Sequence, residues 1–301
     1  MNERNRLLFY VVESSLHAGL GNSLGRVDMI IQRERYTRFP IIEASSLKGV
    51  FRSAFDKRMS KDDPENNVVS ILFGPEKGDE YSGSLIMSNA NILLFPIKSM
   101  KNVYALATCP SALLRFNEYL QKVGKKPLKI PKPNTVPENT NLIILENKIV
   151  LEEFTFEISE SDACSTLAEF LAEYIIGDDE DYAYLKEKIE NDLVILSDDD
   201  FSYFVQYSTE LHTRTKIDPA TGTVQHTGLF TEEYLPADTV LYSLVSISKI
   251  YADGKHIFSD TDKDAESKKA LNYFIEHLPK AIQIGKNGSI GKGIVKIFGG
   301  N

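Results

Sequence analysis

The amino-acid sequence predicts an α+β protein built around antiparallel sheet. Strand-like and helix-like segments are mixed along its 301 residues, and no regular β-α-β repeat runs through them. A hydrophobic content of 42% and a charged content of 26% are typical of a globular domain with a buried core. The irregular mixture therefore favours α+β over a doubly wound parallel fold.

The N-terminal region predicts a strand, a glycine-rich loop and two extended arms. Residues 6–14 are rich in aliphatic and aromatic side chains, which is typical of a buried strand. Glycines recur through residues 19–25 and predict a loop. Residues 28–35 and 36–43 then predict two short extended arms.

An amphipathic helix follows the arms, with Ser45 or Ser46 as its expected N-cap. Its apolar residues recur at helical spacing and share one face: Leu47, Val50, Phe51, Ala54 and Phe55. The opposite face is basic and carries Lys48, Arg52, Lys57 and Arg58. Residues 61–67 predict a polar loop, and residues 68–73 predict a short apolar element.

The next part of the chain predicts two strands, a helix and a linker. Residues 84–97 and 103–108 predict the strands. Pro110 suits the first turn of a helix and Gly124 the position just after its end, because proline lacks an amide hydrogen and glycine tolerates positive φ. Residues 125–141 hold several prolines and predict an extended linker.

The acidic middle of the chain predicts a hairpin and two helices. Residues 142–158 predict a hairpin that turns at Asn147, and residues 162–177 and 181–191 predict the helices. Three consecutive aspartates occupy residues 198–200. A helix N-terminus, whose dipole attracts carboxylates, explains them better than a cation site does.

A long hairpin is predicted near residue 220. Residues 207–217 and 223–235 form its arms, and the turn sequence over 218–222 combines a proline that fixes φ with a glycine that permits positive φ. Because both arms are largely polar, we expect this hairpin to project from the protein. An apolar strand over 239–250 and a helix over 262–278 follow.

A second glycine-rich loop covers residues 285–293, between strands expected at 281–284 and 293–298. It lacks the Walker A pattern, because Gly293 stands where that motif requires Ser or Thr. Its glycine repeat fits either a plain hairpin turn or a loop whose backbone N–H groups approach a polyanion.

Charge is distributed unevenly along the chain. The formal net charge of −9 by itself argues against a nucleic-acid ligand. Residues 26–58, however, hold eight cations against four carboxylates, and residues 268–296 hold six lysines against one glutamate. Residues 152–200 hold seventeen carboxylates and two lysines. This polarity allows a basic groove on an acidic protein.

Several protein classes are excluded by what the sequence lacks. No run of about 18 apolar residues predicts a membrane span, and the N-terminus lacks the apolar core of a signal peptide. Cys109 and Cys164 have neither metal-binding spacing nor a disulfide framework. We therefore expect a cytoplasmic protein with two free thiols and no membrane partner.

Two groups of polar residues are candidates for chemistry. His17 and Asp28 bracket the first glycine-rich loop, where each is either a structural hydrogen-bonding residue or part of a site. Glu232, Glu233 and Tyr234 end the predicted hairpin. Two carboxylates and a phenol can orient a hydroxyl or hold a metal, or they can form an exposed strand end. The sequence shows no Ser-His-Asp or His-Glu-x-x-His pattern.

Taken in order, several segments closely resemble one family, the backbone subunit of the type III-B CRISPR effector (the Cmr complex) within the RAMP superfamily. They include Leu-His-Ala-Gly at 16–19 and Leu-Gly-Arg-Val-Asp at 24–28. The others are residues 31–40, 45–52, 94–99, 108–110, 213–219, 229–236 and 284–293. The resemblance covers nearly the whole chain, although the glycine loops alone are shared across RAMP proteins.

The resemblance implies a single RAMP domain over residues 1–301. Its centre is an RRM-like (ferredoxin-like) palm built from N- and C-terminal parts. Residues 125–200, approximately, form an acidic inserted helical region, and residues 207–236 form a projecting thumb hairpin. Family members stack as a helical filament along a CRISPR RNA, beside other Cmr-complex subunits.

The resemblance also implies an endoribonuclease that cuts complementary, single-stranded target RNA at regular intervals. Asp28 corresponds to the family's catalytic aspartate and would hold Mg²⁺ or another divalent cation. His17, Glu232 and Tyr234 correspond to assisting residues, with Glu233 as the alternative thumb carboxylate. The residues expected to bind RNA are Arg33, Arg35, Ser45, Ser46, Lys48, Arg52, Lys286, Asn287 and Lys292.

Two alternatives remain open from the sequence. The chain is a catalytically silent subunit that coats the CRISPR RNA, or it is a freestanding nuclease that processes CRISPR RNA without partner subunits. The presence of Asp28 favours a nuclease over the silent subunit, and the filament-like family pattern argues against the freestanding enzyme.

Overall fold

The computed structural model describes residues 4–22, 27–58, 67–75, 81–251 and 256–299, with the backbone alone at residues 22, 67 and 225–227. Gly25 of the first predicted loop and most of the predicted loop over 61–67 lie outside these residues, as does the side chain of His226. Among the described helices, none is both long enough and apolar enough to cross a membrane.

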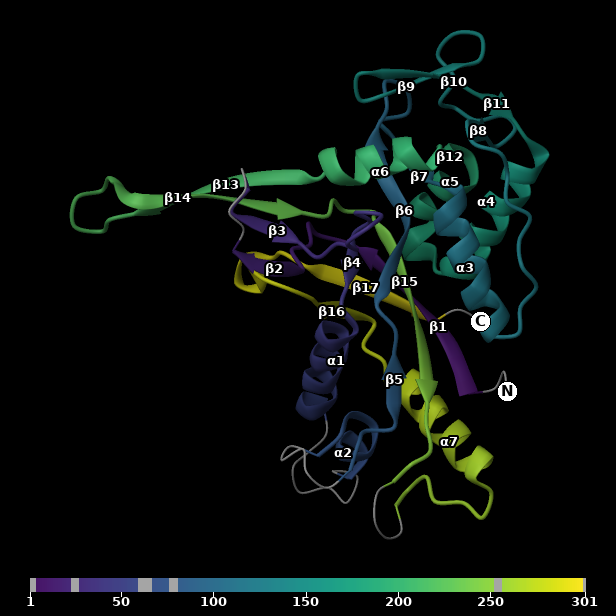
Figure 1. Ribbon diagram of the computed structural model, residues 1–301, viewed down its shortest axis with the longest axis vertical. Coiled ribbons are helices and arrows are strands. Elements are labelled where there is room, and N and C mark those ends of the chain that lie inside the picture. Colours follow the sequence, from purple (N-terminus) through teal and green to yellow (C-terminus); the bar gives the residue numbers. More distant parts are fainter. Residues whose placement is uncertain (1–3, 23–26, 59–66, 76–80, 252–255, 300–301) are drawn as a thin grey trace.

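A large mixed sheet runs through the centre of the molecule (Figure 1). Strand β1 (Asn5–Val12), third from one end of the strand order, pairs antiparallel with β15 (Val240–Ile247) and with β17 (Ile294–Gly299). The other strands are β4 (Ile41–Ile42), β5 (Leu85–Met87), β6 (Ala90–Lys98), β7 (Tyr104–Thr108), β8 (Thr135–Val136), β11 (Ser159–Glu160), β12 (Leu193–Ile195) and β16 (Ala281–Gln283). Their order is β11-β8-β12-β7-β6-β15-β1-β17-β16, with β4 beside β6 and β5 beside β15.

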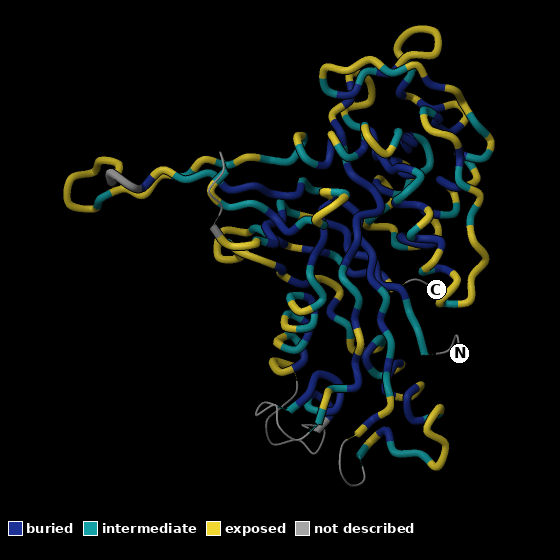
Figure 2. The backbone as a smooth tube through the Cα atoms, viewed as in Figure 1, coloured by how far each residue is buried: buried dark blue, intermediate teal, exposed yellow. Residues whose placement is uncertain are grey.

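Helices cover both faces of this sheet, so β1 is buried on both sides (Figure 2). Leu8, Tyr10 and Val12 point to the core that also contains apolar residues of α1 (Ala44–Arg58), α2 (Asn67–Phe73) and α7 (Lys263–Glu276). The alternate residues of β1 point to a second core with α3 (Pro110–Lys122), α4 (Asp162–Ile175) and α5 (Ala183–Asp192). The two-residue period of a strand produces this division. The predicted α+β class is confirmed at this level.

The ends of several helices lie where neighbouring residues in the sequence predict them. Pro110 occupies the first turn of α3, and Gly124 follows its end with a φ of 82°. Gly177 follows α4 in the same way, with a φ of 61°. The three aspartates at 198–200 form the first turn of α6 (Asp198–Tyr207), where the Ser197 hydroxyl accepts a hydrogen bond from the amide of Asp200. These predictions are confirmed. They succeed because each depends only on residues that are neighbours in the sequence.

Two predicted boundaries are wrong, and one predicted hairpin has a second turn. Helix α1 begins at Ala44, so Ser45 and Ser46 lie in its first turn rather than capping it, and the Asn89 side chain accepts the Ala44 amide hydrogen instead. Residues 19–22 form strand β2 (Gly19–Asn22) rather than loop, because they pair with a neighbouring strand. The predicted hairpin over 142–158 does turn at Asn147, where Leu145 pairs with Lys148, and it turns a second time at residues 152–153, between β9 (Lys148–Leu151) and β10 (Phe154–Glu157).

The predicted hairpin projects from the body as two long strands, β13 (Glu210–Ile217) and β14 (Val224–Tyr234) (Figure 1). Its tip is exposed and its root is buried (Figure 2). At the root, β14 pairs parallel with β3 (Met29–Ile31), which pairs with β2, so the four form one sheet in the order β13-β14-β3-β2. This second sheet brings the chain near residue 28 to the base of the hairpin.

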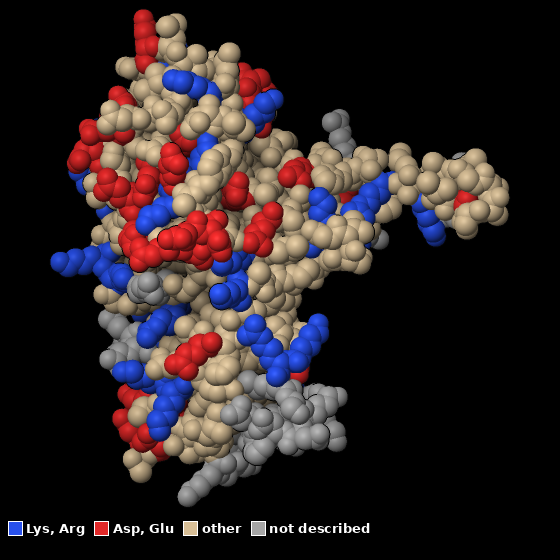
Figure 3. All heavy atoms as spheres, turned by 180° about the vertical axis from the view of Figure 1, so that it is seen from behind, with Lys and Arg blue, Asp and Glu red and all other residues tan. Residues whose placement is uncertain are grey.

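The acidic segment gathers in one part of the molecule. On the face in Figure 3, carboxylates crowd the upper part, which α3–α6 and the β9–β10 hairpin form, while Lys and Arg side chains lie mainly below it. The projecting hairpin extends from the boundary between these parts. The uneven distribution of charge along the sequence is therefore also an uneven distribution of charge over this face of the protein.

Candidate active site

Asp28 lies at the root of the hairpin. It directly precedes β3, and its Oδ2 atom accepts a hydrogen bond of 2.8 Å from the backbone amide of Thr231 in β14. The next residue, Met29, is paired in register with Glu232. Asp28 is exposed, and the described residues supply no partner for its Oδ1 atom. One carboxylate oxygen is therefore anchored while the other is open to a ligand.

Beside it, four polar side chains form what we call the hairpin-root network: Arg214, Glu232, Tyr234 and Asn287. The Glu232 carboxylate is 2% exposed and accepts hydrogen bonds from the Tyr234 hydroxyl at 2.7 Å and from the Asn287 amide at 3.1 and 3.2 Å. The Arg214 Nε atom lies 2.8 Å from the same carboxylate. Arg214 and Asn287 also donate to the Tyr234 oxygen, at 3.0 and 2.8 Å.

The network moves two pKa values in opposite directions. Burial raises the pKa of Glu232, but the hydrogen bonds from Tyr234 and Asn287 and the charge of Arg214 outweigh it and leave that pKa below the usual value. Burial, and then the hydrogen bond to Glu232, raise the pKa of Tyr234. At neutral pH the pair is therefore a carboxylate that accepts and a phenol that donates.

Glu233 points to the other face of β14, as strand alternation requires. Its carboxylate lies 2.5 Å from the Arg33 guanidinium and accepts hydrogen bonds from the Thr209 hydroxyl at 2.9 Å and from the Ile31 amide at 3.0 Å. The carboxylate that joins Tyr234 is thus Glu232, and Glu233 ties β14 to β3.

His17 is buried against the same strand. Its Nδ1 atom lies 2.6 Å from the backbone oxygen of Glu233. A carbonyl only accepts, so Nδ1 carries the hydrogen, and Nε2 of a neutral imidazole is left as an acceptor. A Cβ atom at Gly285 would lie 2.1 Å from the His17 backbone oxygen, so glycine is required there. The two glycine-rich segments meet around this histidine.

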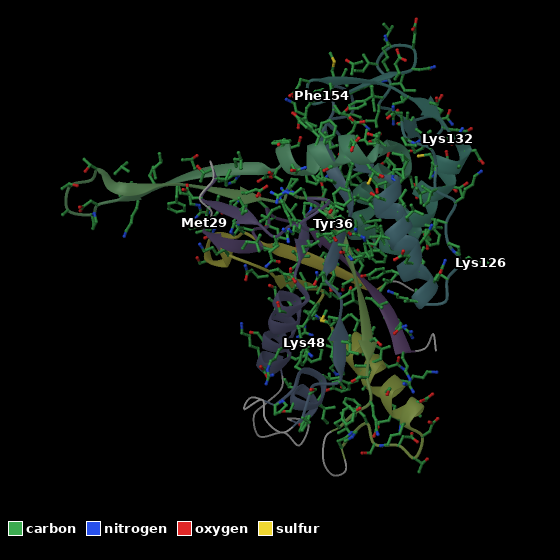
Figure 4. All side chains as sticks on the ribbon, viewed as in Figure 1. Met29, Tyr36, Lys48, Lys126, Lys132 and Phe154 are labelled. Carbon is green, nitrogen blue, oxygen red and sulfur yellow. The ribbon has the colours of Figure 1, made fainter. Side chains whose placement is uncertain are left out.

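A pocket of about 290 Å³ opens beside His17. It is lined by β2, by β3 and the residue after it, by the first turn of α1 and by the second glycine-rich loop; its residues include Gly19, Met29, Gln32, Ser46, Gly285 and Lys286. Figure 4 shows Met29 at the base of the hairpin and Lys48 further along α1. Backbone amides, a hydroxyl and an ammonium group together suit a phosphate.

The residues expected to bind RNA differ in how free they are. Arg35, Ser45 and Lys286 are exposed. Others are engaged within the protein, as follows: Arg33 with Glu233, Lys48 with the Leu85 backbone oxygen, Arg52 with the Gly74 backbone oxygen, Asn287 with the hairpin-root network and Lys292 with the Ser15 hydroxyl. Burial, and then the charge of Arg52, lower the pKa of Lys48. Lys286 lies at the pocket and Arg35 in the arm before α1, so these two cations are accessible at separate places.

A preformed protein cage for a metal is absent from the described residues, because they contain no group of three or more His, Cys, Asp or Glu side chains. Asp28 still offers one open carboxylate oxygen. Mg²⁺ commonly binds one or two carboxylates together with substrate phosphates and water. The donor set fits a cation shared with a bound polyanion better than a cation held by the protein alone.

Arg214 and Gln32 were missed from the sequence. The Gln32 side chain donates to the Gly19 backbone oxygen and accepts from the Glu43 amide, so it holds β2 against the start of α1. No local pattern marks it. For Arg214 a signal exists, since period-two alternation places it on the same hairpin face as Glu232.

Comparison with known proteins places this architecture in a family. The model of the RAMP superfamily matches residues 9–296, and the chain belongs to that superfamily. It is 38% identical over 286 residues to the CRISPR system Cmr endoribonuclease Cmr4 of Pyrococcus furiosus, covering 93% of this chain and 90% of the relative. The predicted relationship to Cmr backbone subunits is confirmed.

Solved structures agree with the sequence comparison. The crystal structure of oligomeric Cmr4 from Pyrococcus furiosus matches with a TM-score of 0.71 at 29% identity, covering 99% of this chain and 98% of that one. A cryo-EM structure of the type III-B Cmr-beta complex bound to cognate target RNA contains a chain with a TM-score of 0.75 at 18% identity, covering 98% of this chain and 96% of that one. The latter likeness concerns the fold.

Proposed function

We propose that this protein is the repeated backbone subunit of an RNA-guided antiviral CRISPR complex. In this role it binds CRISPR RNA along a helical filament with other Cmr-complex subunits and cleaves complementary target RNA at regular intervals. The observation that carries the proposal is an open Asp28 carboxylate, anchored at the root of a projecting hairpin in a chain that matches a named Cmr endoribonuclease over 93% of its length.

The strand arrangement supports the RRM-like palm. The strands β17, β1, β15 and β6 are neighbours in that order and all pair antiparallel, with α1 between β1 and β6 and α7 between β15 and β17. This is the order of a ferredoxin-like β-α-β-β-α-β unit. The β13–β14 hairpin then corresponds to the thumb, and residues 125–200 to the inserted acidic region.

The chemistry needs few groups if the target strand is distorted. The 2′-oxygen attacks the adjacent phosphorus and its proton passes to a base, while the bond to the 5′-oxygen of the next nucleotide breaks and that oxygen takes a proton from water. The products are a 2′,3′-cyclic phosphate and a 5′-hydroxyl. Asp28 or the Nε2 atom of His17 accepts the first proton, and Lys286 stabilises charge on the phosphorane. The hairpin supplies the in-line geometry by displacing a nucleotide.

A divalent cation, Mg²⁺ or a similar ion, is part of the proposal. Asp28 would hold it together with RNA phosphate oxygens, as the donor set favours. When bound, the cation supplies positive charge that lowers the cost of charge on the phosphate. Because the described residues form no protein cage, we expect cation binding to depend on the presence of RNA.

The deciding experiment uses the chain assembled with CRISPR RNA and its partner subunits. End-labelled complementary RNA is added with Mg²⁺, and the reaction is repeated with Asp28→Asn, a variant of nearly the same shape. We expect evenly spaced cuts that slow by roughly 10²–10⁴-fold in the variant while CRISPR RNA binding is retained. A well-assembled wild type that leaves the RNA intact would instead establish a silent scaffold.

A further inference from the structure

The hairpin-root network joins parts of the chain that are distant in sequence. Arg214 comes from β13, Glu232 and Tyr234 come from β14, and Asn287 comes from the second glycine-rich loop. The Lys292 ammonium lies 5.1 Å from the centre of the Tyr234 ring and adds a second contact from that loop. The network is therefore a polar contact between the hairpin and the second glycine-rich loop, and we call this contact the joint.

We propose that Asn287, together with Arg214, is a positioning residue for RNA cleavage, which holds the hairpin root and through it the Asp28 carboxylate. This inference rests on the proposed nuclease function. It assigns Asn287 to the interior of the protein rather than to RNA. It also assigns Glu232 the role of an anchor rather than of a proton carrier.

The hydrogen-bond count supports these roles. The Asn287 amide has two N–H groups, and its contacts with Glu232 and the Tyr234 oxygen occupy both of them. The Glu232 carboxylate receives three donors while it is 2% exposed. A carboxylate with a lowered pKa and no open face is poorly suited to take a proton from a substrate.

A short backbone path links this joint to Asp28. The Asp28 carboxylate is held by the amide of Thr231, the residue directly before Glu232. Met29, directly after Asp28, is in register with Glu232. A displacement of Glu232 therefore also moves Thr231, which holds the Asp28 carboxylate, and Met29, which follows Asp28 in the chain. A shift of about 1 Å in such a group can cost on the order of 10²-fold in rate.

The backbone at Asn287 permits a clean test. Asn287 has a φ of 66°, in the left-handed region that glycine also adopts without strain. Asn287→Gly therefore removes the amide and leaves the backbone geometry. Asn139 provides the matched control, because it is exposed and has a φ of 63°. Asn139→Gly makes the same chemical change in the inserted region.

Single-turnover cleavage is measured for both variants in the assembled complex, beside the affinity for target RNA. We expect Asn287→Gly to cut at least about 10-fold more slowly with RNA affinity within twofold, and Asn139→Gly to match wild type. Equal rates for Asn287→Gly and wild type would overturn the inference while the nuclease function stands.

Asn287→Asp adds a readout that a purely structural contact would not move. Its new carboxylate faces Glu232, so one of the two carboxyl groups takes a proton as the pH falls. Arg214, His17, His212, Lys292 and the Tyr234 phenol also face this cluster and are common to wild type. We therefore expect the ratio of variant to wild-type rate to rise as pH is lowered from 8 to 6. A flat ratio would contradict the positioning role.

Hydrogen exchange in the isolated chain tests the joint independently of catalysis. Asn287→Gly is expected to speed amide exchange in β3 and in the root of β14, and to leave α4 unchanged. Unchanged exchange at the root would overturn the inference even if wild type proves not to cleave. A wild type that does not cleave, with faster exchange in the variant, would retain the joint and reject its catalytic consequence.

Discussion

The hairpin-root network and the ion pair around Lys188 are both buried, but the first connects the hairpin to the second glycine-rich loop and the second connects a helix to a nearby turn. Lys188 and Asp192 lie one turn apart on α5, with side chains that are 4% and 2% exposed. The Lys188 ammonium also donates to the backbone oxygens of Asn102 and Tyr104, so it closes the turn between β6 and β7. The hairpin-root network connects segments more than fifty residues apart and borders an exposed carboxylate.

The difference teaches how to separate a structural ion pair from a functional one. The Lys188 pair lies among α5, β6 and β7, away from the projecting hairpin (Figure 1). Its role ends at the turn it stabilises. In the hairpin-root network, Glu232 directly follows Thr231, whose amide holds the open Asp28 carboxylate. Burial and a short ion pair are thus common to both, and only the neighbouring exposed group distinguishes them.

The largest expected effect on stability belongs to the Lys188 pair. Lys188→Met leaves the Asp192 carboxylate buried without its cation, so we expect the free energy of unfolding to fall by about 3–5 kcal/mol. Denaturant unfolding of the isolated chain measures this loss. The double variant Lys188→Met with Asp192→Leu removes both charges and should recover most of the stability. Slower cleavage per folded molecule in Lys188→Met would contradict the proposed separation.

Glu232→Gln is expected to have a smaller effect that depends on pH. The variant keeps the shape but weakens hydrogen bonds to a charged group, which costs about 1.5–3 kcal/mol. The folded-state pKa of Glu232 lies below its usual value of 4.5, so the contribution of the carboxylate to stability is present above that pH and is lost as pH falls through the folded pKa. Thermal unfolding from pH 7 to pH 3 should therefore show the two proteins converging at the acidic end. A constant difference across that range would argue against an ionised Glu232.

Arg214→Lys is expected to change stability least. Lysine keeps the charge near Glu232 but cannot contact Glu232 and the Tyr234 oxygen together as the guanidinium does. The Arg214 side chain is 28% exposed, so water compensates part of the loss, and we expect about 0.5–1.5 kcal/mol. Cleavage should slow more than this stability change suggests, because the second contact orients the phenol. Comparison with Lys216→Arg, at an exposed position of the same strand, controls for general effects on the hairpin.

The sequence predicted much of the fold because many of its signals are local. The Pro110 and Gly124 pair sets the ends of α3, and the turn over 218–222 sets the hairpin. Boundaries failed where a contact with another segment decides the outcome. The segment 19–22 becomes a strand only because β3 lies beside it, and α1 begins at Ala44 only because Asn89 accepts its amide hydrogen.

For the candidate site, the sequence by itself determined which side chains are available and, through the family resemblance, which of them to group. His17, Asp28, Glu232 and Tyr234 indeed meet around the hairpin root. Their roles as a catalytic set stay a prediction. The sequence also determined that Glu232 and Glu233 face opposite sides once they lie in a strand, since side chains alternate along it.

Only the tertiary structure decided which of these groups are free. From the sequence, Arg33 and Asn287 are both candidates to bind RNA. In the structure both are engaged within the protein, because Arg33 pairs with Glu233 and Asn287 donates to Glu232. The physical reason is long-range pairing: β3 lies beside β14 from about two hundred residues away, and the second glycine-rich loop folds back onto both. A buried charge takes the partner that the fold supplies, and no local pattern specifies that partner.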